Sequence, residues 1–134
     1  MNVYVLIRLA AEEYAMPVGH VREVAELGRV EPVPRARPEL LGIKNLRGQI
    51  LPVIDLARLL GVPHTAAPAC LLVAEASGRR VGFAIGEVSG LGELPDPDEE
   101  TDSDLLVGAV LSHGGLIGVI DTPGVFDALE GTRR

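Results

Sequence analysis

The chain has 134 residues, the length of one ordinary domain, and its four aromatic residues leave the core to aliphatic side chains. The net charge of −7 comes from residues 93–104 (ELPDPDEETDSD), which contain seven acids and no base, while the rest is balanced at 12 acids and 12 bases. Without a basic stripe or stacking aromatics, the chain is a poor candidate for nucleic-acid binding. The acidic segment lacks apolar residues and is predicted to be a solvated connector.

The sequence also limits where the protein works. No apolar run approaches the roughly 20 residues that a membrane-spanning helix needs. The N-terminal sequence MNVYVLIRLAAEEY lacks the charged flank and cleavage site of a signal peptide. These observations predict a cytoplasmic protein. The one cysteine, Cys70, cannot form an internal disulfide and is expected to be a buried thiol.

In chain order, the predicted elements are mostly short strands separated by Gly and Pro. Residues 3–9 (VYVLIRL) should place Val3, Val5, Ile7 and Leu9 on one face. The prolines of residues 32–38 predict an extended surface segment. Six further strands are expected to pair into three hairpins through two-residue or Gly-containing turns. They lie at residues 40–46, 48–54, 70–76, 79–85, 105–111 and 116–121, and one or two more are expected within residues 14–24.

Two short helices are predicted at equivalent places. In DLARLLG, Asp55 should cap the N-terminus and Gly61 should follow the last turn. In PGVFDALEG, Pro123 should take the first position and Gly131 should follow the end, with Asp121 or Thr122 as the cap. Many short strands without a long amphipathic helix predict a mainly β fold.

An internal repeat divides the chain. A shift of 66 residues lays residues 41–55 on 107–121, and a shift of 67 lays residues 14–21 on 81–88. A unit of about 60 residues is marginally stable alone, so two such units should pack over a shared apolar seam, with a groove between them. We therefore expect one domain over residues 1–134, with subdomains at about 1–64 and 65–134 and strand exchange allowed at the boundary.

Catalytic, metal and cofactor sites find little support in the sequence. The DTPG motif at residues 121–124 resembles a GTPase element, but no phosphate-binding loop precedes it. Asp55 and Asp121 are equivalent in the repeat, and helix capping explains both acids better than a carboxylate pair does. The histidines at positions 20, 64 and 113 lack ligand-like spacing. We predict no enzyme, no metal and no cofactor.

Five blocks of sequence resemble the CheW-like domain family of bacterial chemotaxis. They are YAMPVGHVREV, VEPVPRARP, LLGIKNLRGQILPVIDLARLLG, RRVGFAIGEVSGL and LVGAVLSHGGLIGVID. The resemblance covers residues 3–129 and implies two packed five-stranded SH3-like β-barrel subdomains with short helices. It implies a non-catalytic adaptor that couples the cytoplasmic tips of methyl-accepting chemoreceptors to the regulatory domain of a CheA-type histidine kinase. Such an adaptor of a two-component system would be recruited to membrane-associated receptor arrays.

The resemblance also implies a partner-binding site. Arg47, with Asn45 and Gly48, falls on the N-L-R-G element implicated in coupling, and Val21 and Glu23 fall on positions associated with receptor binding. An arginine on a tight turn can form bidentate hydrogen bonds with a partner.

Several alternatives remain open at this point. Arg47 could instead hold the chain together through Glu23 or Asp55, and Val21, Ile43 and Leu46 could be core residues. The protein could bind a small ligand or nucleotide through Asp121 to Gly124, or could be a stand-alone kinase-binding regulator that ignores the receptor. The pathway could be flagellar chemotaxis, twitching motility or another receptor–kinase system.

Overall fold

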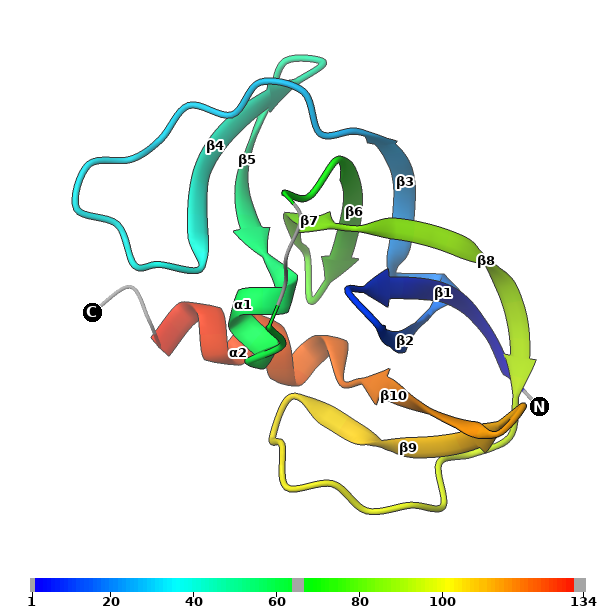
Figure 1. The fold of residues 1–134 in the computed structure, drawn as a ribbon. Coiled ribbons are helices and arrows are strands. Elements are labelled where there is room, and N and C mark those ends of the chain that lie inside the picture. Colours follow the sequence, from blue (N-terminus) through cyan, green and yellow to red (C-terminus); the bar gives the residue numbers. More distant parts are fainter. Residues whose placement is uncertain (1, 64–66, 132–134) are drawn as a thin grey trace.

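The computed structural model describes residues 2–63 and 67–131, which form two five-stranded sheets, two α-helices and one short 3₁₀-helix (Figure 1). We call the first sheet barrel 1; its order is β8 (Glu87–Leu94), β1 (Asn2–Leu9), β2 (Glu12–Pro17), β10 (Gly115–Ile120) and β9 (Leu106–Ser112). We call the second sheet barrel 2; its order is β3 (Val21–Glu26), β6 (Cys70–Ala76), β7 (Arg79–Ile85), β5 (Gln49–Asp55) and β4 (Leu40–Leu46). The predicted mainly β fold with two five-stranded subdomains is confirmed.

The three predicted hairpins form through turns that have positive φ at both central residues. These pairs are Arg47–Gly48 (φ 50° and 85°), Ser77–Gly78 (54° and 75°) and His113–Gly114 (50° and 80°). Turns of this kind match the right-handed twist of the flanking strands, which is why two residues suffice to join them. The hairpins β4–β5, β6–β7 and β9–β10 are therefore fixed in register by local sequence.

The repeat is present in three dimensions. The unit β4–β5 followed by α1 (Leu56–Leu60) corresponds to β9–β10 followed by α2 (Thr122–Gly131). In each unit an incoming segment forms an isolated bridge to the edge strand, Glu31 with Ile43 and Glu99 with Ala109. The aspartate that ends each unit caps the next helix: Asp55 Oδ1 accepts from Arg58 N at 3.2 Å, and Asp121 Oδ1 accepts from Gly124 N at 3.1 Å.

The two barrels do not coincide with residues 1–64 and 65–134, because strands are exchanged between the two halves, as the expectation allowed. The hairpin β1–β2 joins β8, β9 and β10 in barrel 1, whereas β3, β4 and β5 join β6 and β7 in barrel 2. The first strands of each half have thus been exchanged, and the 3₁₀-helix Val18–His20 carries the chain from barrel 1 to barrel 2. Barrel 2 is one continuous stretch from β3 to β7, and barrel 1 is completed from both ends of the chain.

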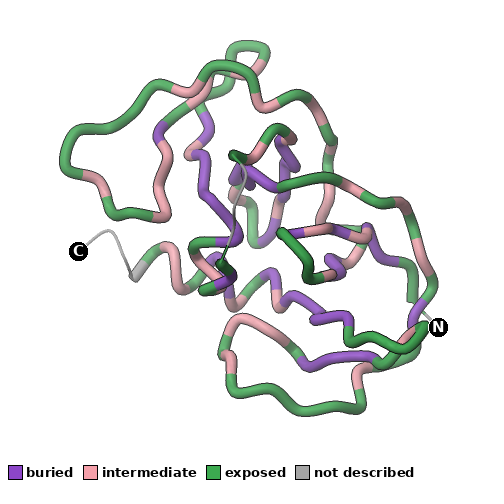
Figure 2. Tube along the Cα trace, viewed as in Figure 1, coloured by how far each residue is buried: buried purple, intermediate pink, exposed green. Residues whose placement is uncertain are grey.

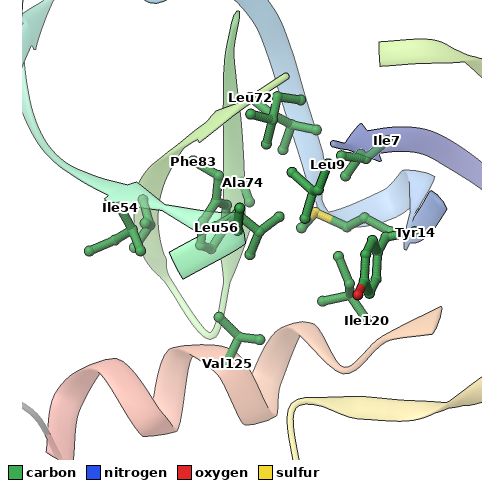
Figure 3. Close-up of a cluster of buried hydrophobic side chains, with 14 of the residues drawn as sticks. Ile7, Leu9, Tyr14, Ile54, Leu56, Leu72, Ala74, Phe83, Ile120 and Val125 are labelled. Atoms are coloured by element: carbon green, nitrogen blue, oxygen red, sulfur yellow. The ribbon is translucent and has the colours of Figure 1, made fainter. Parts of the chain in front are cut away.

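A shared core lies between the barrels and fills the expected seam. Side chains from both sheets and both helices meet there, and Figure 3 shows Ile7 and Leu9 of barrel 1 facing Leu72 and Phe83 of barrel 2. Phe83 stacks edge-on against Phe126 of α2, with 6.3 Å between ring centroids. The seam is therefore packed with buried side chains of both barrels, as the repeat predicted.

Each barrel also has a smaller interior core of its own. Strand β6 shows the alternation: Leu71 and Val73 face the interior of barrel 2, while Leu72 and Ala74 face the shared core. A strand buried on both faces carries a continuous aliphatic run, which explains sequences such as CLLVAEA. Figure 2 shows this burial concentrated on the inner strands and the exposed residues on the connecting segments.

Four sequence predictions need correction. Strand β8 was missed, because the glycines of EVSGLGEL obscure its alternation. Val3 is exposed although Val5, Ile7 and Leu9 are buried as predicted. Helix α2 begins at Thr122 and includes Gly131, so Pro123 is its second residue. Cys70 is only half-buried, and burial raises the pKa of its thiol.

Within the described residues, neither helix is both long and apolar enough to cross a bilayer.

Candidate partner-binding site

Arg47 stands at the tip of the β4–β5 hairpin, on a turn that its neighbours stabilise. Asn45 Oδ1 accepts a hydrogen bond from Gly48 N at 2.9 Å, which closes the turn, and Gly48 supplies the left-handed conformation at φ 85°. Arg47 is itself left-handed at φ 50°, and 69% of its side chain is exposed. Asn45 and Gly48 thus shape the turn that carries the arginine.

Glu23 receives the Arg47 guanidinium in a two-pronged contact. Arg47 Nη1 donates to Glu23 Oε1 at 2.6 Å, and Nη2 donates to Oε2. Strands β3 and β4 are the two edges of the sheet, so this ion pair joins one edge to the hairpin at the other. Of the two intramolecular partners considered for Arg47, Glu23 is confirmed, and Asp55 instead caps α1.

The strand β3 reaches this position through a bulge. Its register with β6 shifts between Val21 and Glu23, so Arg22 is an additional residue that re-aims Glu23. Glu23 lies opposite Val73 and therefore faces the same way as the interior of barrel 2. The ion pair consequently covers one end of that interior, which we call the mouth of barrel 2.

Further polar residues complete the mouth. Arg80 Nε donates to Glu75 Oε1 at 2.8 Å, and its Nη1 donates to Gln49 Oε1 at 2.8 Å. Arg22 Nε reaches the same Glu75 oxygen at 3.3 Å. The sequence reasoning missed this network, although the two-residue Ser77–Gly78 turn makes Glu75 and Arg80 cross-strand partners and could have revealed it.

These contacts keep the carboxylates of the mouth ionised. The hydrogen bond from Arg47 lowers the pKa of Glu23, against a smaller opposing effect of burial, and the charge of Arg80 contributes further. The hydrogen bond from Arg80 likewise lowers the pKa of Glu75, with Arg22 adding to it. The mouth therefore presents fixed charges around an arginine that remains largely open to solvent.

At the corresponding mouth of barrel 1, the charged residues of barrel 2 are replaced by residues of opposite or no fixed charge. A cross-strand pair of reversed order, Arg8 with Glu13, stands where barrel 2 has Glu75 with Arg80. His113 occupies the hairpin tip, and Gly90 lies at the repeat position of Glu23, so the bidentate pair has no counterpart. The asymmetry marks the mouth of barrel 2 as the more specialised surface.

The structure separates Val21 from this site. Val21 is partly buried and packs against the shared core, whereas Glu23 and Arg47 lie at the mouth. Leu46 packs against the interior core of barrel 2, as the core interpretation expected, but Ile43 is exposed. Ile50 of the same hairpin is more exposed still, at 60%; it pairs with Asn45 across the strands, and the sequence reasoning did not select it.

Comparison with known proteins decides the family. A family model described as a CheW-like domain matches residues 3–130, nearly the whole chain. The chain belongs to the CheW-like family. Its Arg47 turn and its paired barrels are therefore features of a CheW-like protein, and the resemblance inferred from the sequence is confirmed.

Named relatives place this CheW-like chain among chemotaxis proteins. It is 27% identical over 137 residues to the chemotaxis protein CheW of Rhizobium meliloti, covering 94% of this chain and 88% of the relative. It is 28% identical over 117 residues to protein FrzA of Myxococcus xanthus, covering 86% and 71%. The scaffolding protein TtCheW of Thermoanaerobacter tengcongensis superposes with a TM-score of 0.80 at 25% identity, covering 90% of this chain and 88% of that one.

The rival site at Asp121 to Gly124 is occupied by helix capping. Asp121 accepts from Gly124 N, and a Cβ added at Gly124 would stand 2.8 Å from Asp121 Oδ2. The loop is thus packed around its own carboxylate, and a nucleotide-binding role is not favoured. No cluster of three metal-ligating side chains occurs among the described residues, and His64 lies outside them.

Proposed function

We propose that the protein is a non-catalytic adaptor that couples chemoreceptors to a CheA-type histidine kinase. Its membership of the CheW-like family over residues 3–130 is the observation that carries this proposal. A solved relative is titled a scaffolding protein, and the core of this chain is packed by side chains of both barrels, as suits a rigid scaffold. In this role the adaptor is recruited from the cytoplasm to receptor arrays at the membrane.

The mouth of barrel 2 is the proposed receptor-binding surface. Arg47 is exposed and held by Glu23, so its guanidinium is already oriented when a partner arrives. Pre-ordering the side chain lowers the entropy lost on binding. Asn45 and Gly48 contribute by fixing the turn, and Val21 contributes by anchoring the start of β3 to the shared core.

A separate surface on barrel 1 is proposed for the kinase. Leu111 and Leu116 lie opposite each other in the β9–β10 hairpin and are 66% and 60% exposed, and Leu91 on the edge strand β8 is 68% exposed. Apolar side chains at a sheet edge suit packing against a similar barrel. Two surfaces on different barrels allow receptor and kinase to bind together.

The test is a pull-down of the full chain with the cognate receptor-tip fragment and with the kinase regulatory domain. We expect both to be retained. The variant Leu111→Ser/Leu116→Ser should lose the kinase at least tenfold and keep the receptor, while Val107→Ser, an equally exposed position on β9, is the matched control.

Different outcomes separate the alternatives. Retention of the kinase alone would replace the adaptor with a stand-alone kinase-binding regulator. Retention of neither fragment would contradict the proposal. Equal losses from the leucine pair and from Val107→Ser would remove the assignment of the kinase surface.

A further inference from the structure

A second hollow lies apart from the mouth of barrel 2 and is unused by the proposed adaptor role. It measures about 350 Å³ and is enclosed by barrel 2, the proline-rich segment before β4 and the end of α2. In Figure 1 this segment arcs away from β4 toward the end of α2. Its apolar wall comes from the side chains of Leu40, Ile43, Pro52, Ile54, Val81 and Leu129. Cavities of this size and character are typical of small-molecule sites.

The apolar character of this hollow is particular to barrel 2. A hollow of about 410 Å³ lies at the equivalent place in barrel 1, but Arg8, Glu12 and Glu13 are among the residues that line it. Tyr14 and Gly118 of barrel 1 stand at the repeat positions of Val81 and Pro52. A Cβ added at Gly118 would meet the Tyr14 ring at 2.9 Å, so the ring lies over that glycine. Burial, together with the hydrogen bond from the Tyr14 hydroxyl to Glu12 at 2.6 Å, raises the pKa of Tyr14. The same place in the fold is therefore lined by charged residues and a polar-tipped ring in barrel 1 and by an apolar wall in barrel 2.

One cation stands at the rim of the hollow without a counter-ion. Arg35 lines the hollow, and its side chain forms no ion pair or hydrogen bond with another described residue. Its neighbour Arg37 is matched by Glu39, with 3.4 Å between Nε and Oε1. Among the described residues that line the hollow, the rim thus offers one uncompensated positive charge above an apolar wall.

The backbone of Arg35 is strained in order to place that charge. Ala36 N donates to Val33 O at 3.3 Å, which makes residues 33–36 a turn with Pro34 and Arg35 at its centre. Arg35 has φ 63°, in a position where such a turn favours Gly. Backbone strain of this kind is often found where a side chain is needed at a ligand site.

We propose that this hollow binds a small amphipathic carboxylate, with its apolar body against the wall and its carboxylate on Arg35. A guanidinium is the side chain best suited to paired hydrogen bonds with a carboxylate. The apolar wall disfavours sugars, whose many hydroxyls would lose their hydrogen bonds to water. A single free cation disfavours nucleotides, whose phosphates carry several charges.

The experiment is calorimetric titration of the full chain with octanoate and with octanol, its neutral counterpart. We expect saturable binding of octanoate and at least tenfold weaker binding of octanol. Methyl chemical shifts should move at Ile43, Ile54 and Leu129. Absence of saturable octanoate binding, equal binding of both probes, or shifts at Ile7, Leu9 and Leu72 of the shared core without any at Ile43 would overturn the proposal.

Arg35→Gly is the decisive variant, because it removes the cation and relieves the backbone at the same time. Octanoate affinity should fall at least tenfold while the melting temperature is unchanged or higher. Arg29→Ala is the matched control: it removes a cation of the same segment that pairs with Glu31 at 2.7 Å and does not line the hollow. Unchanged octanoate binding in Arg35→Gly, or an equal loss in Arg29→Ala, would refute the assigned role of Arg35.

A second variant tests the apolar wall independently of charge. Val81→Tyr places a larger side chain in the wall of the hollow, the residue found at the equivalent place in barrel 1, so octanoate affinity should fall. Ile43→Phe narrows the hollow from an exposed position that tolerates a larger side chain. Octanoate affinity unchanged in a folded Ile43→Phe protein would contradict the location of the site.

Discussion

Arg47 and His113 occupy the same turn position in the two barrels and present different chemistry on nearly identical backbones. Both have φ 50°, and each is followed by a left-handed glycine. What differs is the support, since Glu23 braces Arg47 with two hydrogen bonds while Gly90 stands at the equivalent strand position. If this surface binds the receptor as proposed, its specificity rests on the pair, because Arg47 needs Glu23 to orient its guanidinium.

Replacing Arg47 should affect binding far more than stability. An exposed ion pair contributes little to folding because water screens it, so Arg47→Ala should shift the melting temperature only slightly. Receptor retention in the pull-down should fall at least tenfold, because the oriented guanidinium is gone.

The charge-reversed double variant Glu23→Arg/Arg47→Glu distinguishes the two roles of the pair. This variant can restore the intramolecular ion pair. However, it presents a carboxylate to the receptor at position 47, where the wild type presents a guanidinium. We expect receptor binding to remain lost. Recovered binding would show that the pair is only a structural brace.

The titration of Glu23 should report on the same contact. Its pKa is lowered in the folded protein, so the ion pair is present above the ordinary carboxyl pKa and is lost as the pH falls through the lowered value. In Arg47→Ala the Glu23 carboxyl, followed by NMR, should titrate at higher pH than in the wild type. An unchanged midpoint would contradict the bidentate contact.

At the scale of elements, the edge strand of each barrel is covered by an incoming segment that passes close to a glycine. A Cβ at Gly42 would stand 2.0 Å from Glu31 O, and a Cβ at Gly108 would stand 2.8 Å from Glu99 O. These contacts let the two isolated bridges form against β4 and β9. The glycines are thus required by close approach of two backbones, one in each repeat.

Alanine substitution at these glycines should lower the free energy of unfolding by different amounts. Gly42→Ala combines the 2.0 Å approach with a φ of 151° and should cost about 3 kcal/mol or more in the free energy of unfolding. Gly108→Ala should cost less, about 1–3 kcal/mol. Gly19→Ala, which has no atom within 4 Å of the added Cβ, is the control and should be nearly neutral in denaturant melts. A Gly42→Ala protein as stable as Gly19→Ala would show that Glu31 does not pack there.

Most strands and both helices could be predicted from the sequence, because turn and capping signals act between residues that are close together in the chain. Ser77–Gly78 and Arg47–Gly48 fix their hairpins, and Asp55 with Gly61 fixes α1, because each signal acts within a few residues. Strand β8 was missed because its order comes from pairing with β1, over 80 residues away in sequence. The Glu23–Arg47 contact was one of two candidates, since the bulge at Arg22 decides where Glu23 points.

At the scale of the whole molecule, the shared core makes the two barrels one cooperative unit. It includes buried residues of β1 and β2 from barrel 1, of β5, β6 and β7 from barrel 2, and of both helices. Neither barrel can lose its packing without exposing the apolar face of the other. The sequence repeat predicted such a seam but not the exchange of hairpins across it, because a repeat shows which segments are alike and not which of them pair.

Cooperativity can be measured because both tyrosines lie in barrel 1. Leu72→Ala removes a fully buried side chain of barrel 2 from the shared core and should cost about 2–5 kcal/mol. The denaturation midpoint by fluorescence of Tyr4 and Tyr14 should fall together with the midpoint by circular dichroism. Leu71→Ala, inside barrel 2, should shift both probes as well. A tyrosine transition that stays in place would mean that the barrels unfold separately.

The exchange of hairpins has a consequence for how the chain is made on the ribosome. Barrel 2 is continuous from Val21 to Ile85, so all its strands have emerged while the C-terminal third is still being translated. The β1–β2 hairpin emerges first. Until β8 pairs with β1 and β10 pairs with β2, the outer edges of this hairpin have unsatisfied backbone hydrogen-bonding groups. Translation speed and chaperone protection should therefore matter most for barrel 1, the first to be started and the last to be closed.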